Sequence, residues 1–126
     1  MNVRFRKKQA HKWVDKWRYR LLLNEWHFDL FYPDKELEDI VADINVDPVY
    51  LRAAINLYPK WFRSTDYDAE HSLVHEMCHC LTQELWNAAK SLQRGIVYHE
   101  HHLSDCAERL TQRITNAVFW KSPKET

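Results

Sequence analysis

Residues 72–81 have the sequence SLVHEMCHCL, in which His75, Glu76 and His79 form an H-E-x-x-H pattern. No Pro or Gly interrupts this stretch, and the residues directly before and after the pattern are uncharged and compatible with a helix. We therefore predict a buried helix here. Two imidazoles and a carboxylate are costly in such a place unless they have a partner, and a metal ion supplies one.

The spacing of the two histidines suits one metal ion. Residues four apart on a helix project from the same side, one turn from each other, so His75 and His79 can both bind one Zn²⁺. Glu76 points beside the metal, where it can take a proton from a metal-bound water that then attacks a carbonyl group. The pattern predicts His75 and His79 as zinc ligands and Glu76 as the general base.

The second half of the chain is predicted to be helical around this motif. A helix capped by Thr65 or Asp66 runs to about Lys90, with a core face of Leu73, Met77, Leu81 and Leu85. Residues 91–97 are expected to form a loop and residues 122–126 a frayed tail. Between them, a last helix has an apolar stripe at helical spacing, made of Leu103, Ala107, Leu110, Ile114 and Val118.

The first half is predicted to hold one helix and a small sheet. Residues 4–23 are an amphipathic basic helix with its apolar side at Phe5, Trp13, Trp17 and Leu21. Residues 26–32, 40–47 and 54–58 are expected to be short strands, the second and third joined as an antiparallel hairpin through the turn at Asp47-Pro48. The predicted fold is α+β, with a mainly antiparallel sheet of about three strands packed on three main helices.

Length and composition limit the alternatives. A chain of 126 residues, 45% apolar and 29% charged, is expected to form one domain over residues 1–126. The only glycine, Gly95, argues against a Gly-rich phosphate loop or a dinucleotide-binding fingerprint. No membrane span or signal peptide is predicted, and three cysteines make a poor disulfide framework. We expect a reduced, cytoplasmic location, in a bacterium or a phage-infected host cell.

The motif with its uncharged flanks resembles the zincin metallopeptidases. The order of an aromatic strand, an alternating hairpin, a D-P turn and the motif helix is similar to that of small SprT-like and phage-encoded metallopeptidases, over about residues 26–110. The resemblance implies a minimal zincin-like domain that hydrolyses peptide bonds with a zinc-bound water, a carboxylate base and a third metal ligand downstream. The expected partner is a protein or peptide substrate.

Several residues are candidates for the third ligand. Glu100 lies three residues before Leu103 and seven before Ala107, so helical phase favours it. His99, four residues before Leu103, fits the pattern of the SprT-like proteins, except that Glu100 follows it where they have a glycine. His102 and Asp105 are further alternatives, and His101 is expected to face solvent. Asp105 and Glu108 can also act as partners that orient an imidazole.

Three other interpretations stay open beside the peptidase. A structural zinc site at Cys78 and Cys80 is disfavoured, because residues two apart on a helix point about 200° from each other. A zinc-bound adaptor without catalysis is possible. So is nucleic-acid or partner binding by the basic N-terminal helix, since residues 1–20 hold eight Lys or Arg against one acid, Asp15. Its candidate contacts are Lys8, Lys12, Lys16, Arg18 and Arg20.

Overall fold

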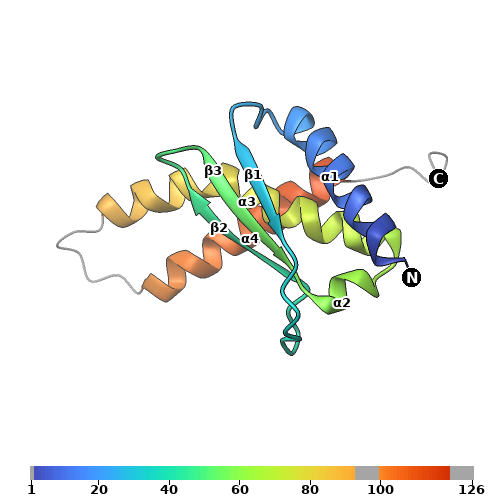
Figure 1. Cartoon of the computed structure of the whole chain (residues 1–126). Helices are drawn as coiled ribbons and strands as arrows, with labels where there is room; N and C mark the ends of the chain where they lie inside the picture. The colour runs from blue at the N-terminus through green and yellow to red at the C-terminus, as the bar shows by residue number, and fades with distance from the viewer. Residues whose placement is uncertain (1, 93–99, 120–126) are drawn as a thin grey trace.

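The computed structural model describes residues 2–92 and 100–119, without the side chains of residues 84, 85, 87, 88, 91, 92, 100–103, 105, 106, 113 and 117. Its elements are α1 (Val3–Arg20), β1 (His27–Phe31), β2 (Ala42–Asp47), β3 (Arg52–Leu57), α2 (Pro59–Phe62), α3 (Asp66–Leu92) and α4 (Glu100–Phe119) (Figure 1). The predicted α+β class, with three strands and three main helices, is confirmed. The predicted tail and most of the predicted loop lie outside the described residues.

The sheet is mixed, with strand order β1-β3-β2. The predicted hairpin is confirmed: β2 and β3 are antiparallel, from Ala42 opposite Leu57 to Asp47 opposite Arg52. In contrast, β1 pairs with β3 in parallel. One of the two pairings is therefore antiparallel and the other parallel, and β2 is an edge strand on the side of α3.

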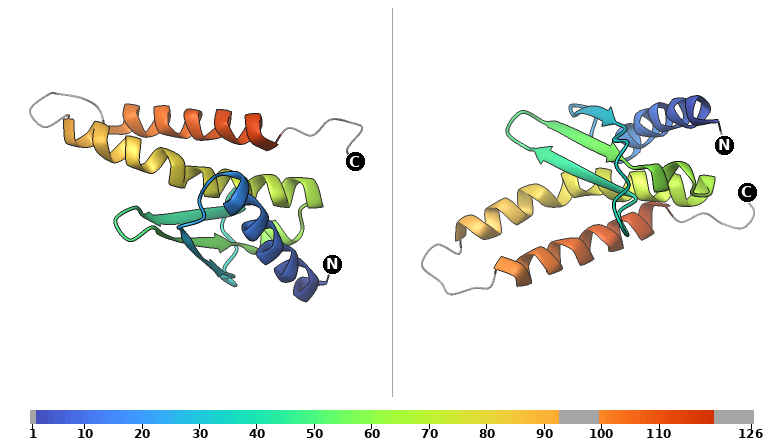
Figure 2. Two further views of the ribbon diagram at one scale, coloured as in Figure 1. Left: turned by 90° about the horizontal axis from the view of Figure 1, so that it is seen from above. Right: turned by 60° about the horizontal axis from the view of Figure 1, so that its bottom comes forward.

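Helix α3 lies between the sheet and α4 (Figure 2). It is therefore covered on more than one side, and the buried residues near the motif include Leu73, Val74, Met77 and Cys78. The predicted core positions Leu73 and Met77 are confirmed, whereas Leu81 is 40% exposed. Thr82, the next residue, is buried instead. The side chain of Leu85 lies outside the described residues.

Helix α1 packs on α3 through aromatic and charged side chains. Trp17 is buried as predicted and donates its indole N–H to Glu70 Oε2 over 2.6 Å. The prediction that Phe5 faces the core is wrong, because its side chain is 57% exposed. The neighbouring Arg6 takes the inward position, where it donates to the Ser64 carbonyl and pairs with Asp66. This charged side chain can be buried because its partners lie at the start of α3 and in the segment just before it.

Helix α4 is turned by about one residue from the predicted phase. Leu110 and Val118 are partly exposed, while Thr111, Thr115 and Phe119 are buried. The two threonines tolerate burial because each hydroxyl donates to a backbone carbonyl one turn back: Thr111 to Ala107 over 2.9 Å and Thr115 to Thr111 over 2.7 Å. Glu108 precedes this buried set by three, seven and eleven residues, so it shares the same face.

The short helix α2 was not predicted. Pro59 ends the strand, as expected, and also begins this helix, a position where proline is favoured because its missing N–H has no helical partner. Trp61 of α2 is completely buried and donates its indole N–H to the Ala69 carbonyl over 2.8 Å. The turn thus fixes the start of α3 against the sheet. Among the described helices, none has the length and apolar character needed to cross a membrane.

Candidate metal centre

The two predicted histidine ligands meet a carboxylate from α4. Their imidazole rings have centroids 5.1 Å apart, and both reach Glu108. His75 Nε2 lies 2.8 Å from Glu108 Oε1, and His79 Nε2 lies 3.2 Å from Glu108 Oε2. One ligand atom from each of the three residues lies within 4.8 Å of the others. Two consecutive helices, α3 and α4, therefore supply one cluster with the atoms that zinc binds.

Solvent can reach this cluster. The side chains of His75 and His79 are 15% and 21% exposed, whereas Glu108 is 57% exposed. Burial lowers the pKa of His79, although the negative Glu108 opposes this effect. The neutral imidazole is the form that binds a metal. The chemistry of the donor set therefore fits a cation that uses three protein ligands and leaves a further position accessible.

The ring of His79 is also held on its other side. Its Nδ1 lies 3.4 Å from the hydroxyl oxygen of Thr111, and that oxygen lies 2.9 Å from the hydroxyl of Thr82. Thr82 and Thr111 are both buried. These contacts place Nε2, rather than Nδ1, on the side of Glu108.

Glu76 lines the same cleft as His75 and Glu108. Its pKa is raised to about 8, chiefly by burial, with further contributions from the negative charges of Glu108 and Asp43. The carboxyl group is therefore held in a place where a negative charge is disfavoured. A nearby divalent cation reverses this effect, because it stabilises the ionised form.

Asp43, on β2, is a component of this region that the sequence did not identify. Its two carboxylate oxygens accept hydrogen bonds from Asn56 Nδ2 and the Tyr58 hydroxyl, each over 2.7 Å. The bond to Asp43, together with burial, raises the pKa of Tyr58. Asp43 thus forms a fixed negative charge that acts on Glu76 from the sheet.

Two hollows flank the cluster. One, of about 360 Å³, is lined by residues that precede or begin β2, by α3 and by α4; these are Asp39, Ile40, Val41, Ala42, His71, Ser72, His75, Glu76, Glu108 and Gln112. The other, of about 200 Å³, lies between α3 and α4 beside His79, Trp86 and Ser104. The first brings the start of β2, Glu76, His75 and Glu108 into one cleft, and His79 lines the second.

The residues predicted as third ligands fall outside what the structure describes. Glu100 begins α4, but its side chain is not described, nor are those of His101, His102 and Asp105; His99 lies outside the described residues altogether. Glu108, considered only as an orienting partner, is the carboxylate found between His75 and His79. It lies eight residues after Glu100, or about 12 Å along a helix axis. The signal that could have found it is its helical phase with Thr111, Thr115 and Phe119.

The cysteines of the motif are buried helix residues, as predicted. Cys78 and Cys80 are free and buried. Burial raises the pKa of the Cys80 thiol to about 12 and also raises that of Cys78, so both thiols are protonated near neutral pH. Neither belongs to the metal-binding group formed by the described residues.

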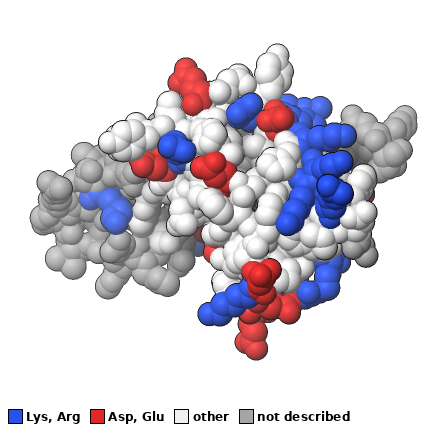
Figure 3. Space-filling view, viewed as in Figure 1, with Lys and Arg blue, Asp and Glu red and all other residues white. Residues whose placement is uncertain are grey.

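The basic helix α1 keeps only part of its charge available. Lys16 pairs with Glu70, and Arg18 pairs with Asp15. Lys8 and Lys12 are exposed, and Figure 3 shows Lys and Arg side chains gathered over this helix. Because Trp17 is buried and Trp13 is partly buried against the core, these rings serve packing, as the spacing indicated. Nucleic-acid binding by α1 stays a prediction.

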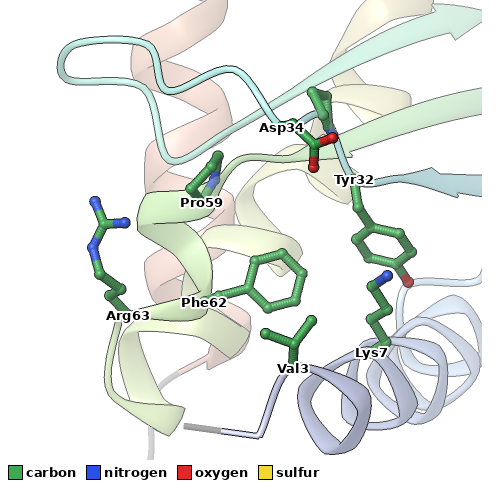
Figure 4. A pocket seen from close by; sticks show the side chains of 8 residues that line it. Val3, Lys7, Tyr32, Asp34, Pro59, Phe62 and Arg63 are labelled. Carbon is green, nitrogen blue, oxygen red and sulfur yellow. The ribbon is translucent and has the colours of Figure 1, made fainter.

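A separate pocket of about 330 Å³ lies between α1, α2 and the segment after β1. Figure 4 shows Val3 and Phe62 facing each other across it, with Lys7 beside the ring of Tyr32. The Lys7 Nζ atom lies 4.6 Å from the centroid of that ring. The pocket contains none of the residues of the metal-binding cluster.

No protein-family model, curated protein or solved structure matches this chain.

Proposed function

We propose that this protein is a zinc-dependent metallopeptidase, with His75, His79 and Glu108 as metal ligands and Glu76 as general base. The observation that carries the proposal is the convergence of both imidazoles on Glu108, within 2.8 and 3.2 Å, at a cleft that also contains Glu76. Three protein ligands and one accessible position are the arrangement of catalytic zinc sites, whereas structural sites have four protein ligands.

The types of ligand atom support zinc over harder cations. Two imidazole nitrogens and one carboxylate suit zinc, while calcium and magnesium prefer oxygen ligands only. Both histidines come from one turn of one helix, so their spacing is set by the backbone before any metal binds. Of the three proposed ligands, only Glu108 depends for its position on the packing of α4 against α3.

Glu76 is placed to move a proton rather than to bind the metal. A zinc ion held by His75, His79 and Glu108 would lower the pKa of a coordinated water and polarise a carbonyl group. Glu76 would take a proton from the attacking water and give it to the amine of the leaving group. The pKa of about 8 describes Glu76 without a cation beside it; a bound cation would favour the ionised carboxylate, which is the form that accepts a proton.

The cleft suits an extended peptide. β2 is an edge strand, so one of its sides has backbone groups that pair with no other strand of the described sheet. Residues 39–42 lead into it and line the cleft beside Glu76. A peptide that adds to such an edge is held by main-chain hydrogen bonds, which recognise any sequence in extended form. Unfolded segments of protein are therefore the substrates we propose.

The zinc content of the purified protein tests this proposal. Protein prepared without chelator, or supplied with zinc after chelation, is expected to hold about one zinc per chain, because it has a single three-ligand group among the described residues. His71→Ala is the matched control: this histidine lies one turn before His75 and bonds Asn116 over 3.2 Å, outside the cluster. It should keep the metal. A parent protein that takes up no transition metal contradicts the proposal.

An adaptor that binds zinc without catalysis is the competing interpretation. Metal content cannot separate the two, because both need the same ligands. Hydrolysis can: zinc-loaded protein that cleaves no member of a broad library of unfolded peptides would favour the adaptor and remove the enzyme assignment.

A further inference from the structure

We infer that Thr111 is a positioning residue for the metal centre, which fixes the tautomer and ring orientation of His79 so that Nε2 presents its lone pair to the metal. The inference rests on the proposed zinc site and extends it to a residue that does not touch the metal. It is carried by the contact of 3.4 Å between the Thr111 hydroxyl oxygen and His79 Nδ1.

The hydrogen bonds of Thr111 assign the position of the proton. A threonine hydroxyl has one hydrogen to donate and two lone pairs to accept with. The Ala107 carbonyl accepts this hydrogen over 2.9 Å, a shorter contact than the 3.4 Å to His79 Nδ1. The oxygen is then left to accept from His79 Nδ1. The Thr82 hydroxyl lies 2.9 Å from this oxygen and 3.3 Å from the His79 carbonyl and can donate to either.

The consequence for His79 follows from the chemistry of imidazole. If the Thr111 oxygen accepts a hydrogen bond from His79, the donor is the N–H at Nδ1. A neutral imidazole has one N–H, so Nε2 then has a free lone pair. Nε2 is the atom that lies 3.2 Å from Glu108 Oε2, inside the metal-binding group. A partner on the far nitrogen is how proteins commonly select the metal-binding tautomer.

Burial makes this partner effective. Thr111 is completely buried and Thr82 nearly so, so water does not compete for His79 Nδ1 from their side. Thr115, on the same helix, serves as a comparison. It is also completely buried, and its hydroxyl also donates to a carbonyl one turn back. Thr115 differs in that its hydroxyl faces the Cys78 thiol and not an imidazole.

The test compares Thr111→Val with Thr115→Val. Each variant removes one buried hydroxyl and keeps a β-branched shape of similar size. Thr111→Val is expected to weaken zinc binding about 10- to 100-fold, measured by competition with a chelating dye, whereas Thr115→Val should stay within about twofold of the parent. Thr111→Ser restores the hydroxyl and should recover most of the affinity.

A second readout follows the tautomer itself. In metal-free protein the Glu108 carboxylate, 3.2 Å from Nε2, also attracts the ring proton, so the tautomer is measured in a Glu108→Ala background. There, ¹⁵N NMR of the histidine ring should show His79 protonated at Nδ1, with Thr115→Val added or not, whereas adding Thr111→Val should populate the Nε2-protonated form. Because this measurement needs no zinc, it distinguishes failure of this inference from failure of the proposed function.

The outcomes separate cleanly. A parent protein that binds no zinc contradicts the metal site and, with it, the role of Thr111 in metal binding. If the parent binds zinc and Thr111→Val binds it as tightly, or if Thr115→Val is weakened as much, then Thr111 contributes only packing and the inference is wrong. A His79 tautomer that does not change when Thr111→Val is added to Glu108→Ala contradicts it as well.

Discussion

Replacing Glu76 with glutamine is expected to lower the hydrolysis of peptide substrates by a factor of about 10² or more, with zinc binding unchanged. Glutamine keeps the size and hydrogen-bonding shape of the side chain but cannot accept a proton near neutral pH. Glu76 lines the cleft beside His75, and it is absent from the group of residues whose atoms converge as metal ligands. The variant should therefore lose the chemical step alone.

The measurement needs both rate and metal content. Cleavage of an unfolded peptide is followed for the zinc-loaded parent, Glu76→Gln and His75→Ala. His75→Ala should lose metal and activity together, because it removes a ligand, so the two variants fail in different ways. Equal rates for the parent and Glu76→Gln would show that Glu76 is not the base.

Removal of Glu108 is expected to weaken zinc binding about 10²-fold. Structural zinc sites with four ligands are worth roughly 10–16 kcal/mol in total, so one ligand contributes about 3 kcal/mol, and 1.4 kcal/mol corresponds to a factor of ten. Glu108→Ala leaves the two histidines on α3 without a third ligand from α4. Because the side chain is largely exposed, its loss should leave the fold intact, as circular dichroism can check.

Glu100→Ala is the decisive comparison for this variant. Glu100 was the ligand favoured by sequence, and both glutamates lie on α4. If Glu108 is the ligand, then Glu100→Ala and His101→Ala should bind zinc as the parent does. If Glu100→Ala releases the metal and Glu108→Ala keeps it, then the sequence-based choice is right and the contacts of Glu108 have another purpose. Loss in His99→Ala alone would favour the SprT-like pattern.

The parts of the site that the sequence predicted are those set by local geometry. His75, Glu76 and His79 lie within five residues of one helix, so their mutual arrangement follows from the 3.6-residue repeat alone. The same holds for the hairpin of β2 and β3, where alternation of side chains and a short turn determine the pairing. Short-range rules were sufficient in both cases.

Which carboxylate of α4 reaches the two histidines depends on the rotation of this helix, and the apolar pattern predicted a different rotation. Leu110 and Val118 have the side chains that burial usually selects, so the stripe was drawn through them. The helix instead buries Thr111 and Thr115, whose hydroxyls bond to its own backbone and to neighbours on α3. A shift of one residue turns a helix by about 100°, which brings Glu108 toward the histidines.

Nor could the parallel pairing be predicted from the strands themselves. The side-chain pattern of β1 would allow it to pair with β2 or with β3, and in a parallel or an antiparallel direction. The position of β1 depends on long-range packing. Trp26 stacks on Phe28, and both side chains belong to the hydrophobic core shared with the helices. Burial of Arg6 has the same origin, because its partners Ser64 and Asp66 lie 58 or more residues away in the chain.

Because β3 lies between β1 and β2, the sheet contains two strand pairings, and these are expected to form one after the other. The ends of the hairpin that meet at Asp47 and Arg52 are five residues apart, whereas His27 and Arg52 are 25 apart. Loop-closure entropy makes the second contact about 1.4 kcal/mol more expensive than the first. The β2–β3 hairpin should therefore already be formed in the transition state for folding, and β1 should join it afterwards. Substitutions in β3 that face β2 should slow folding, while those in β1 should mainly speed unfolding, a difference that φ-value measurements would detect.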